Sequence, residues 1–310
     1  MGIKQKIMGN DKLFKIVSES VDKYTKFLGK NFPVYLSKKK YKKVFGRELD
    51  LINPESLNEK LMYCKFNTYW DNPLVSLCAD KYAVRDFIKK NNCEELLIPL
   101  LGAWDNACDI DWDSLPEKFA IKCNHGSGYN IICSDKKSFD TKKATEELNV
   151  WMNEQYGYRN AEQGIYSLIK RKIIAEKFIE TDDGTPPKDY KFFCSYGKVL
   201  FLFVASDRYD GNTKFDYYYP DWSWIPVKND HPNKGCIEKP ENLEKMIKYA
   251  ERLSKKFPLV RVDFYDADGD VIFGELTFTH FGCMHRFDPD EYDYEFGKMF
   301  PSKEKLKEIK

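Results

Sequence analysis

"FAIKCNHGSGYNIIC", residues 119–133, joins two apolar runs through a glycine-containing loop and carries Lys122 inside the first run. The two short apolar runs predict a strand–loop–strand hairpin. A lysine in such a run is costly to bury unless a negative group meets it. Gly126 and Gly128 expose backbone N–H groups, so the hairpin could fold over phosphates. A plain hairpin with a surface lysine is the alternative that this stretch alone leaves open.

Two common nucleotide-binding motifs do not fit this stretch. A P-loop places its lysine after the glycines and directly before Ser or Thr, whereas Lys122 precedes them. A dinucleotide fingerprint needs a third glycine and a following helix. Ile131 occupies the third glycine position, and the residues after the loop predict a strand.

A second informative stretch is "LVRVDFYDADGDVIFGELTFTH", residues 259–280, in which two β-rich runs flank a DADGD turn. Apolar and polar residues alternate in each run, so each strand has one apolar and one polar face. The polar positions include Arg261, Asp263, Glu275 and Thr277.

The loop length decides whether these polar faces coincide. A two-residue Asp-Gly turn would pair Ala267 with Asp270 and would put the two carboxylates on opposite faces. A three-residue loop, residues 267–269, would pair Asp266 with Asp270 and would use Gly269 as a left-handed bulge residue. We expect the second register, because it keeps the apolar residues together on one face.

Adjacent carboxylates at Asp263 and Glu275 would repel each other unless a proton or a cation lies between them. Mg²⁺ commonly binds one or two carboxylates together with substrate phosphates. Carboxylates simply facing water are the alternative, but they leave Arg261 on the same face without a role. The pattern therefore favours a magnesium site.

Three other site types are weaker. The DADGD turn resembles the start of an EF-hand loop, but Val271 stands where that loop needs glycine. His280, Cys283 and His285 could bind zinc, yet they lack the usual paired spacing and favour a loop. A Ser-His-Asp triad has no G-x-S-x-G elbow to support it.

The composition limits the class of protein. The chain has 310 residues and a net charge of +1, so no overall basic field indicates a nucleic-acid partner. Its nine cysteines lack C-x-x-C spacing and indicate reduced thiols in a cytoplasm. The N-terminal residues have no apolar core typical of a secretory signal, and we see no membrane-spanning segment.

Several further elements follow from local patterns. Residues 1–45 predict lysine-rich helix, either lying on a membrane surface or packing an apolar side on the protein. Ser56 is the expected N-cap of a following helix. A hairpin is expected to turn near Gly197. Pro240 precedes a helix whose apolar stripe comprises Met246, Ile247, Ala250 and Leu253.

The segments "DKYAVRDF", "LPEKFAIKCNHGSG", "IIAEKFIE", "DYKFFCSYGKV", "RVDFY" and "FGELTF" follow one another along the chain. In this order they resemble the ATP-grasp superfamily over roughly residues 50–300. The closest resemblance is to the TupA-like ATP-grasp group, which is associated with teichuronopeptide and other bacterial surface polysaccharides. The resemblance depends on the ordered set, because none of the segments is specific alone.

The resemblance implies an α+β, ATP-grasp fold in which two α+β lobes grip ATP, with an N-terminal helical region. We divide the chain into a helical lysine-rich segment (1–50), an N-terminal α/β subdomain (51–117), a lid subdomain (118–180) and a C-terminal catalytic subdomain (181–310).

The resemblance also implies the nucleotide site. Lys122 would meet the α/β phosphates beneath the loop of residues 125–129, and backbone groups at 176–179 would read adenine, with Glu180 at the ribose. The implied nucleotide contacts are Lys81, Lys122, His125, Gly126, Ser127, Gly128, Glu176, Lys177, Phe178, Ile179, Glu180, Asp189 and Lys191. Arg85 is a weaker alternative to Lys81.

Asp263, Glu275 and Thr277 match the Mg²⁺ positions of the family. Thr277 departs from its pattern, since most members have Asn there, which puts a second metal ion and the shape of the acceptor pocket in question. Arg261 would stabilise the transferring phosphoryl group, together with Lys122 and Lys191. Arg208, in an aromatic-rich stretch that either stacks on sugar or forms an irregular packed loop, is the expected contact of the acceptor carboxylate.

The implied activity is ATP-dependent carboxylate–amine ligation through an acyl phosphate. The expected partners are a carboxylate-bearing glycan or precursor, with a uronic-acid carboxyl, and an amine or amino acid. A glycan kinase of the same fold and a non-catalytic nucleotide-binding component of a polysaccharide assembly complex are the alternatives. We expect the protein in the cytoplasm, with residues 1–45 available for the inner membrane surface or an assembly partner.

Overall fold

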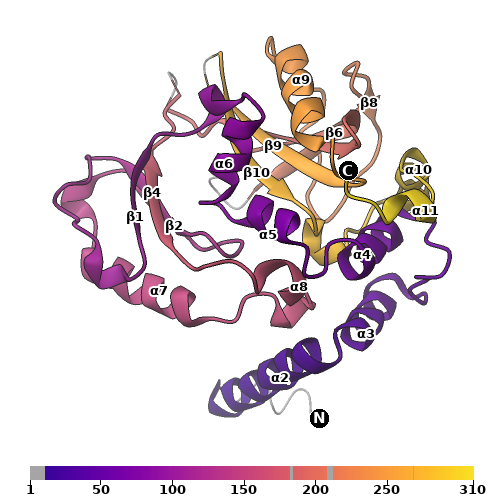
Figure 1. Cartoon of the computed structure of the whole chain (residues 1–310), viewed down its shortest axis with the longest axis horizontal. Helices are drawn as coiled ribbons and strands as arrows, with labels where there is room; N and C mark the ends of the chain where they lie inside the picture. Colours follow the sequence, from indigo (N-terminus) through magenta and orange to yellow (C-terminus); the bar gives the residue numbers. More distant parts are fainter. Residues whose placement is uncertain (1–10, 182–183, 208–211, 268) are drawn as a thin grey trace.

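The computed structural model describes residues 11–181, 184–207, 212–267 and 269–310. Two antiparallel sheets and the helices around them form the molecule, as Figure 1 shows. The expected α+β class is therefore confirmed.

The smaller sheet has four strands in the order β1-β4-β2-β3. Their bounds are Leu100–Trp104 for β1, Ile173–Lys177 for β4, Phe119–Cys123 for β2 and Asn130–Cys133 for β3. Helix α7 (Thr141–Asn153) packs on β2, where Phe119, Ile121 and Cys123 are buried at alternate positions. The strand–loop–strand prediction for residues 119–133 is confirmed. The smaller sheet therefore combines one strand that precedes residue 118, β1, with three strands that follow residue 118.

The larger sheet has six strands in the order β10-β9-β5-β6-β7-β8. Their bounds are Asp270–Thr277 for β10, Val260–Ala267 for β9, Lys188–Ser195 for β5, Lys198–Ser206 for β6, Lys214–Tyr218 for β7 and Trp224–Ile225 for β8. The β5–β6 hairpin turns at Gly197 as predicted. Helix α9 (Leu243–Ser254) lies on this sheet (Figure 1). The expected apolar stripe of α9 packs in the core.

The expected three-residue loop and register of the β9–β10 hairpin are wrong, whereas the expected sharing of one face by the polar residues is right. Ala267 pairs with Asp270, which is the two-residue turn that the apolar pattern argued against. A bulge between Phe273 and Glu275 then shifts the pairing by one residue, so that Glu275 lies opposite Asp263. Gly274 occupies the bulge, where an added Cβ would lie 3.1 Å from the carbonyl oxygen of Asp263. The bulge restores the shared polar face without a longer loop.

The N-terminal helices are α2 (Asp11–Asn31) and α3 (Pro33–Phe45), and they pack against the short 3-10 helix η4 (Tyr158–Asn160). Helix α4 (Leu57–Asn67) begins with the predicted Ser56 cap, whose hydroxyl accepts from the Glu59 N–H at 3.2 Å. The Glu59 carboxylate accepts in return from the Ser56 N–H at 3.1 Å. Reciprocal capping of this kind stabilises a helix start by about 1 kcal/mol.

The remaining helical elements lie before β1, between the strands and after β10. They are α5 (Pro73–Ala79), α6 (Val84–Lys90), η1 (Glu94–Leu96), η2 (Ala107–Asp109), η3 (Lys136–Ser138), α8 (Gln163–Tyr166), η5 (His280–Cys283), α10 (Glu291–Met299) and α11 (Lys303–Leu306). In the described ranges, none of the helices combines the length and the apolar character required to cross a bilayer.

Candidate functional site

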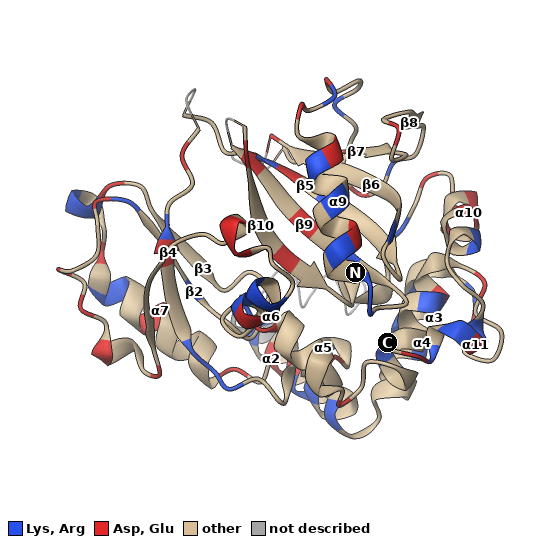
Figure 2. Cartoon of the chain, turned by 45° about the horizontal axis from the view of Figure 1, so that its top comes forward, with Lys and Arg blue, Asp and Glu red and all other residues tan. Residues whose placement is uncertain are grey.

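A cleft of about 970 Å³ is lined by residues of both sheets and by the segments that connect them. Its size falls within the range of small-ligand sites. Most of the predicted site residues line it: Lys81, Lys122, Gly126, Ser127, Gly128, Glu176, Lys177, Phe178, Ile179, Asp189, Lys191, Arg261, Asp263, Glu275 and Thr277. Acidic residues lie on strands β9 and β10 of the larger sheet (Figure 2). The cleft therefore brings together the two stretches of sequence that carry the most chemistry.

Two predicted residues, His125 and Glu180, lie away from the cleft, and a third is not described. His125 is buried beneath the loop, with its ring directed to α7. Glu180 forms an ion pair with Lys118, and both side chains are exposed. Arg208 lies outside the described residues.

The negative partner of Lys122 is Glu176 on β4, whose carboxylate lies 2.5 Å from the Lys122 ammonium group. Glu176 is buried and also lies 3.3 Å from the Arg85 guanidinium group. Arg85 in turn donates to the Ile98 carbonyl oxygen at 2.9 Å and is not among the cleft-lining residues. Glu176 thus holds Lys122 at the wall of the cleft, where its charge can meet an anionic ligand.

Lys81 reaches the cleft because the helical segment around it breaks into α5 and α6. The Asp80 carboxylate accepts from the Tyr82 N–H at 2.8 Å and from the Ala83 N–H at 3.1 Å, which turns the chain at this point. The Lys81 ammonium group donates to the Gly126 carbonyl oxygen of the glycine loop. Burial lowers the pKa of Lys81, so an anion bound beside it would favour the charged form.

The glycine loop is anchored to α7 by two aromatic residues. The His125 Nε2–H donates to the Trp151 carbonyl oxygen at 3.1 Å. The Tyr129 ring stacks on the Trp151 ring with centroids 5.4 Å apart, and its hydroxyl donates to Glu154 at 2.8 Å. Gly126 has no room for a side chain, since an added Cβ would lie 2.8 Å from the Tyr129 ring. Ser127 and Gly128 are left exposed at the cleft.

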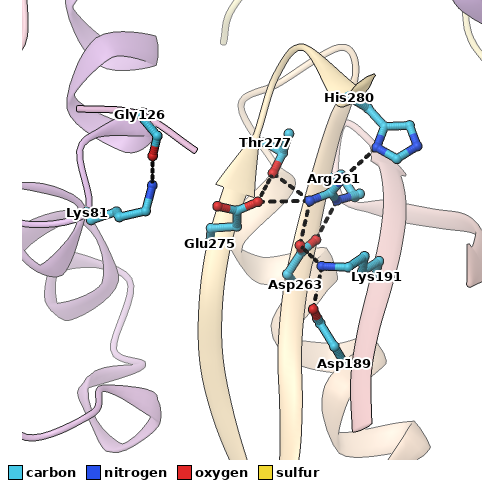
Figure 3. Close-up of polar contacts among 9 residues, drawn as sticks. All are labelled: Lys81, Gly126, Asp189, Lys191, Arg261, Asp263, Glu275, Thr277 and His280. Carbon is cyan, nitrogen blue, oxygen red and sulfur yellow. Dashed lines mark hydrogen bonds and ion pairs between the residues drawn. The ribbon is translucent and has the colours of Figure 1, made fainter. Parts of the chain in front are cut away.

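Arg261 lies at the centre of the acidic cluster on the larger sheet (Figure 3). Its guanidinium group donates to both oxygens of Asp263, at 2.7 and 2.6 Å. The same group donates to Glu275 and to Thr277, each at 2.9 Å. Thr277 also donates to Glu275 at 2.7 Å. One arginine therefore joins the three side chains that were predicted to hold Mg²⁺.

Two further residues complete this cluster. Lys191 lies 2.6 Å from both Asp189 and Asp263, and so it bridges β5 and β9 (Figure 3). His280 accepts from Arg261 through Nδ1. The sequence suggested only a zinc-ligand role for His280. In the structure His280 lies beside Arg261.

The pKa values of the two carboxylates are shifted in opposite directions. Burial opposes ionisation of Glu275, but the cations Lys81, Arg261 and Lys191 outweigh it and lower the pKa of Glu275 to about 2. Lys81 acts on Glu275 from the opposite side of the cleft, so the two walls are electrostatically coupled. Burial raises the pKa of Asp263, against the opposing effect of Arg261 and Lys191.

The cluster fits a hard divalent cation on the chemistry of its donors. Asp263, Glu275 and Thr277 supply only oxygen ligands, which Mg²⁺ prefers. Among the described residues, hydrogen bonds reach Glu275 only through Oε1, which leaves Oε2 for a cation. Within the described ranges no group of three or more His, Cys, Asp or Glu side chains is arranged around a common point. Mg²⁺ would therefore need phosphate oxygens to complete its coordination.

The far end of the cleft was missed in the sequence. It is lined by Asn160 at the end of η4, by Glu162 just after it, and by Phe281 and Gly282 in η5. The Phe281 ring is 49% exposed, and its backbone is left-handed with φ of 47°. A bulky residue held in this conformation is unusual and is often found at functional sites. No local pattern connects these two segments, because they meet only through the tertiary fold.

A protein-family model described as TupA-like ATPgrasp matches residues 59–301. No curated protein gives a significant match. Among solved structures, a D-alanine–D-alanine ligase from Bacillus anthracis is 19% identical, with a TM-score of 0.38, covering 66% of this chain and 59% of its own. An L-amino acid ligase from Bacillus licheniformis is 14% identical, with a TM-score of 0.39, covering 66% of this chain and 44% of its own. The chain thus spans less than two thirds of the length of these structures.

Proposed function

Because the chain belongs to the TupA-like ATP-grasp family, we propose that it is an ATP-dependent carboxylate–amine ligase. The observation that carries this proposal is the cleft with lysines on one wall and an arginine–carboxylate cluster on the other. Such a pair of walls suits a triphosphate, whose charge would be met by Lys81 and Lys122 and by Mg²⁺ at Asp263 and Glu275.

ATP would lie with its adenine against residues 176–179, at the C-terminal end of β4. The glycine loop would cover the phosphates through the backbone N–H groups of Ser127 and Gly128. Mg²⁺, when bound, would neutralise phosphate charge. The side chains of Arg261 and Lys191 would stay directed at the transferring group, because Asp263 holds both of them.

The reaction has two steps. A carboxylate oxygen of the acceptor attacks the γ-phosphorus, the bond to ADP breaks, and an acyl phosphate forms. The amine nitrogen then attacks the acyl carbon, phosphate leaves, and the amine loses a proton. This sequence needs positioning and charge stabilisation rather than a nucleophile of the protein, and Arg261 would stabilise the charge in both steps.

The acceptor would occupy the far end of the cleft, beside Phe281 and Asn160. We assign it to a uronic-acid carboxyl of a surface glycan or its precursor, joined to an amino acid or another amine. The exposed Phe281 ring supports a sugar, since aromatic faces pack on the apolar faces of sugar rings. It offers an exposed stacking surface, whereas Phe215, Tyr217 and Tyr218 of the aromatic-rich stretch are buried. Arg208 lies outside the described residues.

The test uses the purified chain with ATP, Mg²⁺, a uronic-acid oligosaccharide and a mixture of amino acids. We expect ADP and phosphate to appear only when both acceptors are present, with a product mass equal to the two acceptors less one water. ADP release without an amine, and a product that keeps a phosphate, would identify a glycan kinase instead. Nucleotide binding without turnover across a broad acceptor screen would favour the non-catalytic alternative.

A further inference from the structure

Helix α2 carries an apolar face that is exposed along most of its length. Ile16, Val21, Tyr24 and Phe27 are each between 54% and 59% exposed. At 100° per residue these four positions fall within an arc of about 140°. The four exposed residues therefore lie on one face of the helix, where Val17 is half-buried and Leu28 is buried within the same arc. Exposed apolar residues gathered on one face mark contact surfaces.

The opposite side of α2 is attached to the body of the protein. Asp22 lies 2.6 Å from Arg159, and the Gly29 carbonyl oxygen accepts from Gln163 at 2.6 Å. Gly29 lies so close to the backbone of Tyr158 in η4 that an added Cβ would be 1.6 Å from the Tyr158 carbonyl oxygen. These contacts fix which side of the helix faces the protein, so the apolar stripe has to face outward.

The stripe continues beyond the end of α2 and is bordered by basic residues. The Phe27 and Phe32 rings are 6.3 Å apart, edge to face, and Tyr35 in α3 is also exposed. Residues 11–45 contain ten lysines against three acidic residues. Lys23 and Lys30 fall at one margin of the stripe at helical spacing, and both are exposed. An apolar stripe with a lysine margin is complementary to the headgroups and acyl boundary of an anionic membrane.

We propose that this outer face, comprising Ile16, Val21, Tyr24, Phe27, Phe32 and Tyr35 with its lysine margin, binds the surface of an anionic phospholipid bilayer. Helix α2 lies in the plane of the interface with its apolar stripe in the acyl boundary and its lysines at the phosphate groups. Docking of this kind is independent of the proposed ligase activity.

The docked helices are connected to the far end of the cleft. Lys40 of α3 donates to the Asn160 side-chain oxygen at 2.9 Å and to the Arg159 carbonyl oxygen at 2.7 Å. Asn160 lines the cleft, so the docked helices contact a segment that also lines the acceptor end. If the ligase proposal holds, this connection favours an acceptor presented at the membrane surface.

The test is co-sedimentation of the full chain with vesicles of phosphatidylcholine containing phosphatidylglycerol, and with vesicles of phosphatidylcholine alone. We expect binding to the anionic vesicles that weakens as salt is added. The double substitution Ile16→Ser and Phe27→Ser should weaken this binding by about tenfold or more. Lys23→Gln with Lys30→Gln should weaken it on anionic vesicles and reduce its salt dependence.

Val150→Ser on α7 is the matched control, because Val150 is 65% exposed but lies outside the outer face. This variant should bind vesicles like the unaltered chain. Equal binding by the control and the Ile16→Ser/Phe27→Ser variant would overturn the proposal. Absence of binding to either kind of vesicle would also overturn it. Sedimentation velocity would then show whether the outer face, including Phe27, mediates self-association or whether the chain is a monomer, in which case the face would be left for a protein partner.

The two proposals fail in different measurements. Vesicle binding requires no nucleotide or acceptor, and so a failure of the ligase proposal leaves it unchanged. Conversely, ADP release with water-dispersed acceptors requires no bilayer. The Ile16→Ser/Phe27→Ser variant should keep that activity, because neither residue lines the cleft.

Discussion

Arg261 is the residue through which the carboxylates of the cleft are held together. It contacts Asp263, Glu275 and Thr277 from one guanidinium group, and it is itself buried. Its planar, forked donors suit this task, which the single ammonium group of a lysine could not perform. The geometry leaves Glu275 as the carboxylate that is more accessible to a ligand, since Asp263 is buried and both of its oxygens already accept from Arg261.

Glu275→Gln should lower the rate of ATP-dependent product formation by at least about 100-fold, because it removes a charge at the phosphate site without changing side-chain size. Steady-state phosphate release measures the rate, and circular dichroism checks that the fold is kept. Asp270→Asn is the control, because Asp270 is an exposed carboxylate on the same hairpin, and this variant should keep the unaltered rate. Undiminished activity in Glu275→Gln would remove Glu275 from the metal site.

Phe281→Ala should raise the KM for the glycan acceptor by about tenfold and leave the KM for ATP unchanged, since aromatic stacking on a ring contributes about 1 kcal/mol or more. Phe281→Tyr keeps the ring and should restore most of the affinity. A change in the KM for ATP alone would place Phe281 at the nucleotide instead of the acceptor.

His125 makes the stability of the protein dependent on pH. Burial lowers the pKa of His125 to about 4, and its Nδ1 is buried without a hydrogen-bond partner among the described residues. The unfolded chain, with a histidine pKa near 6.5, therefore binds more protons than the folded chain between pH 6.5 and 4. The stability contribution is complete above pH 6.5 and is lost as the pH falls toward 4.

His125→Gln should reduce this pH dependence by an amount on the order of 2 kcal/mol between pH 7 and 4. Glutamine can still donate to the Trp151 carbonyl oxygen but does not titrate in this range. Urea unfolding at a series of pH values gives the free energy of unfolding against pH for the unaltered chain and for the variant. The contributions of the other buried histidines cancel in the difference between these two curves. Parallel curves would show that His125 does not titrate differently on unfolding.

At the scale of single elements, close backbone approaches decide how the helices and strands sit. The β9–β10 hairpin needs Gly274 for its bulge, and α2 needs Gly29 to lie against the Tyr158 carbonyl oxygen. In both cases glycine is required for space and not for a left-handed backbone. These two glycines set the position of Glu275 and the orientation of the outer face.

Gly29→Val should detach α2 from η4, because the new side chain would overlap the Tyr158 carbonyl group. Hydrogen exchange of the amides in residues 11–31 should become at least about tenfold faster, as expected for a helix that has lost its packing. Ser20→Val, at an exposed position of the same helix, is the control. Unchanged exchange in Gly29→Val would mean that α2 is not held by this contact.

At the scale of the whole molecule, the two sheets meet at a cleft whose walls carry opposite charges. Lys81 and Lys122 belong to the smaller lobe and its connection, whereas Asp263 and Glu275 belong to the larger sheet. A ligand that bridges them should stabilise both lobes against unfolding, since it binds only the folded chain.

ADP with Mg²⁺ should therefore raise the Tm in proportion to the logarithm of nucleotide concentration, corresponding to about 2.7 kcal/mol at 100 times the Kd. Differential scanning fluorimetry measures the shift. Lys122→Met should reduce it, and Lys118→Met, an exposed lysine just before β2, should not. A Tm that is insensitive to adenine nucleotides would contradict nucleotide binding in this cleft.

Local patterns in the sequence were enough to predict much of this protein. The apolar runs around Lys122 predicted a hairpin, Ser56 predicted a helix start, and the alternation in residues 259–280 predicted that Arg261 and Asp263 share a face. Each of these predictions depends either on the two-residue alternation of side chains along a strand or on the hydrogen bond of one helix cap. Residues close in the sequence determine both features.

The tertiary structure alone decided the rest. The bulge at Gly274 set the register, although the apolar pattern had favoured a longer turn. Glu176, more than fifty residues along the chain, is the partner of Lys122, and the far end of the cleft joins Asn160 to Phe281. Such contacts form when distant segments pack together, and a sequence pattern carries no information on which of several compatible packings has the lowest free energy.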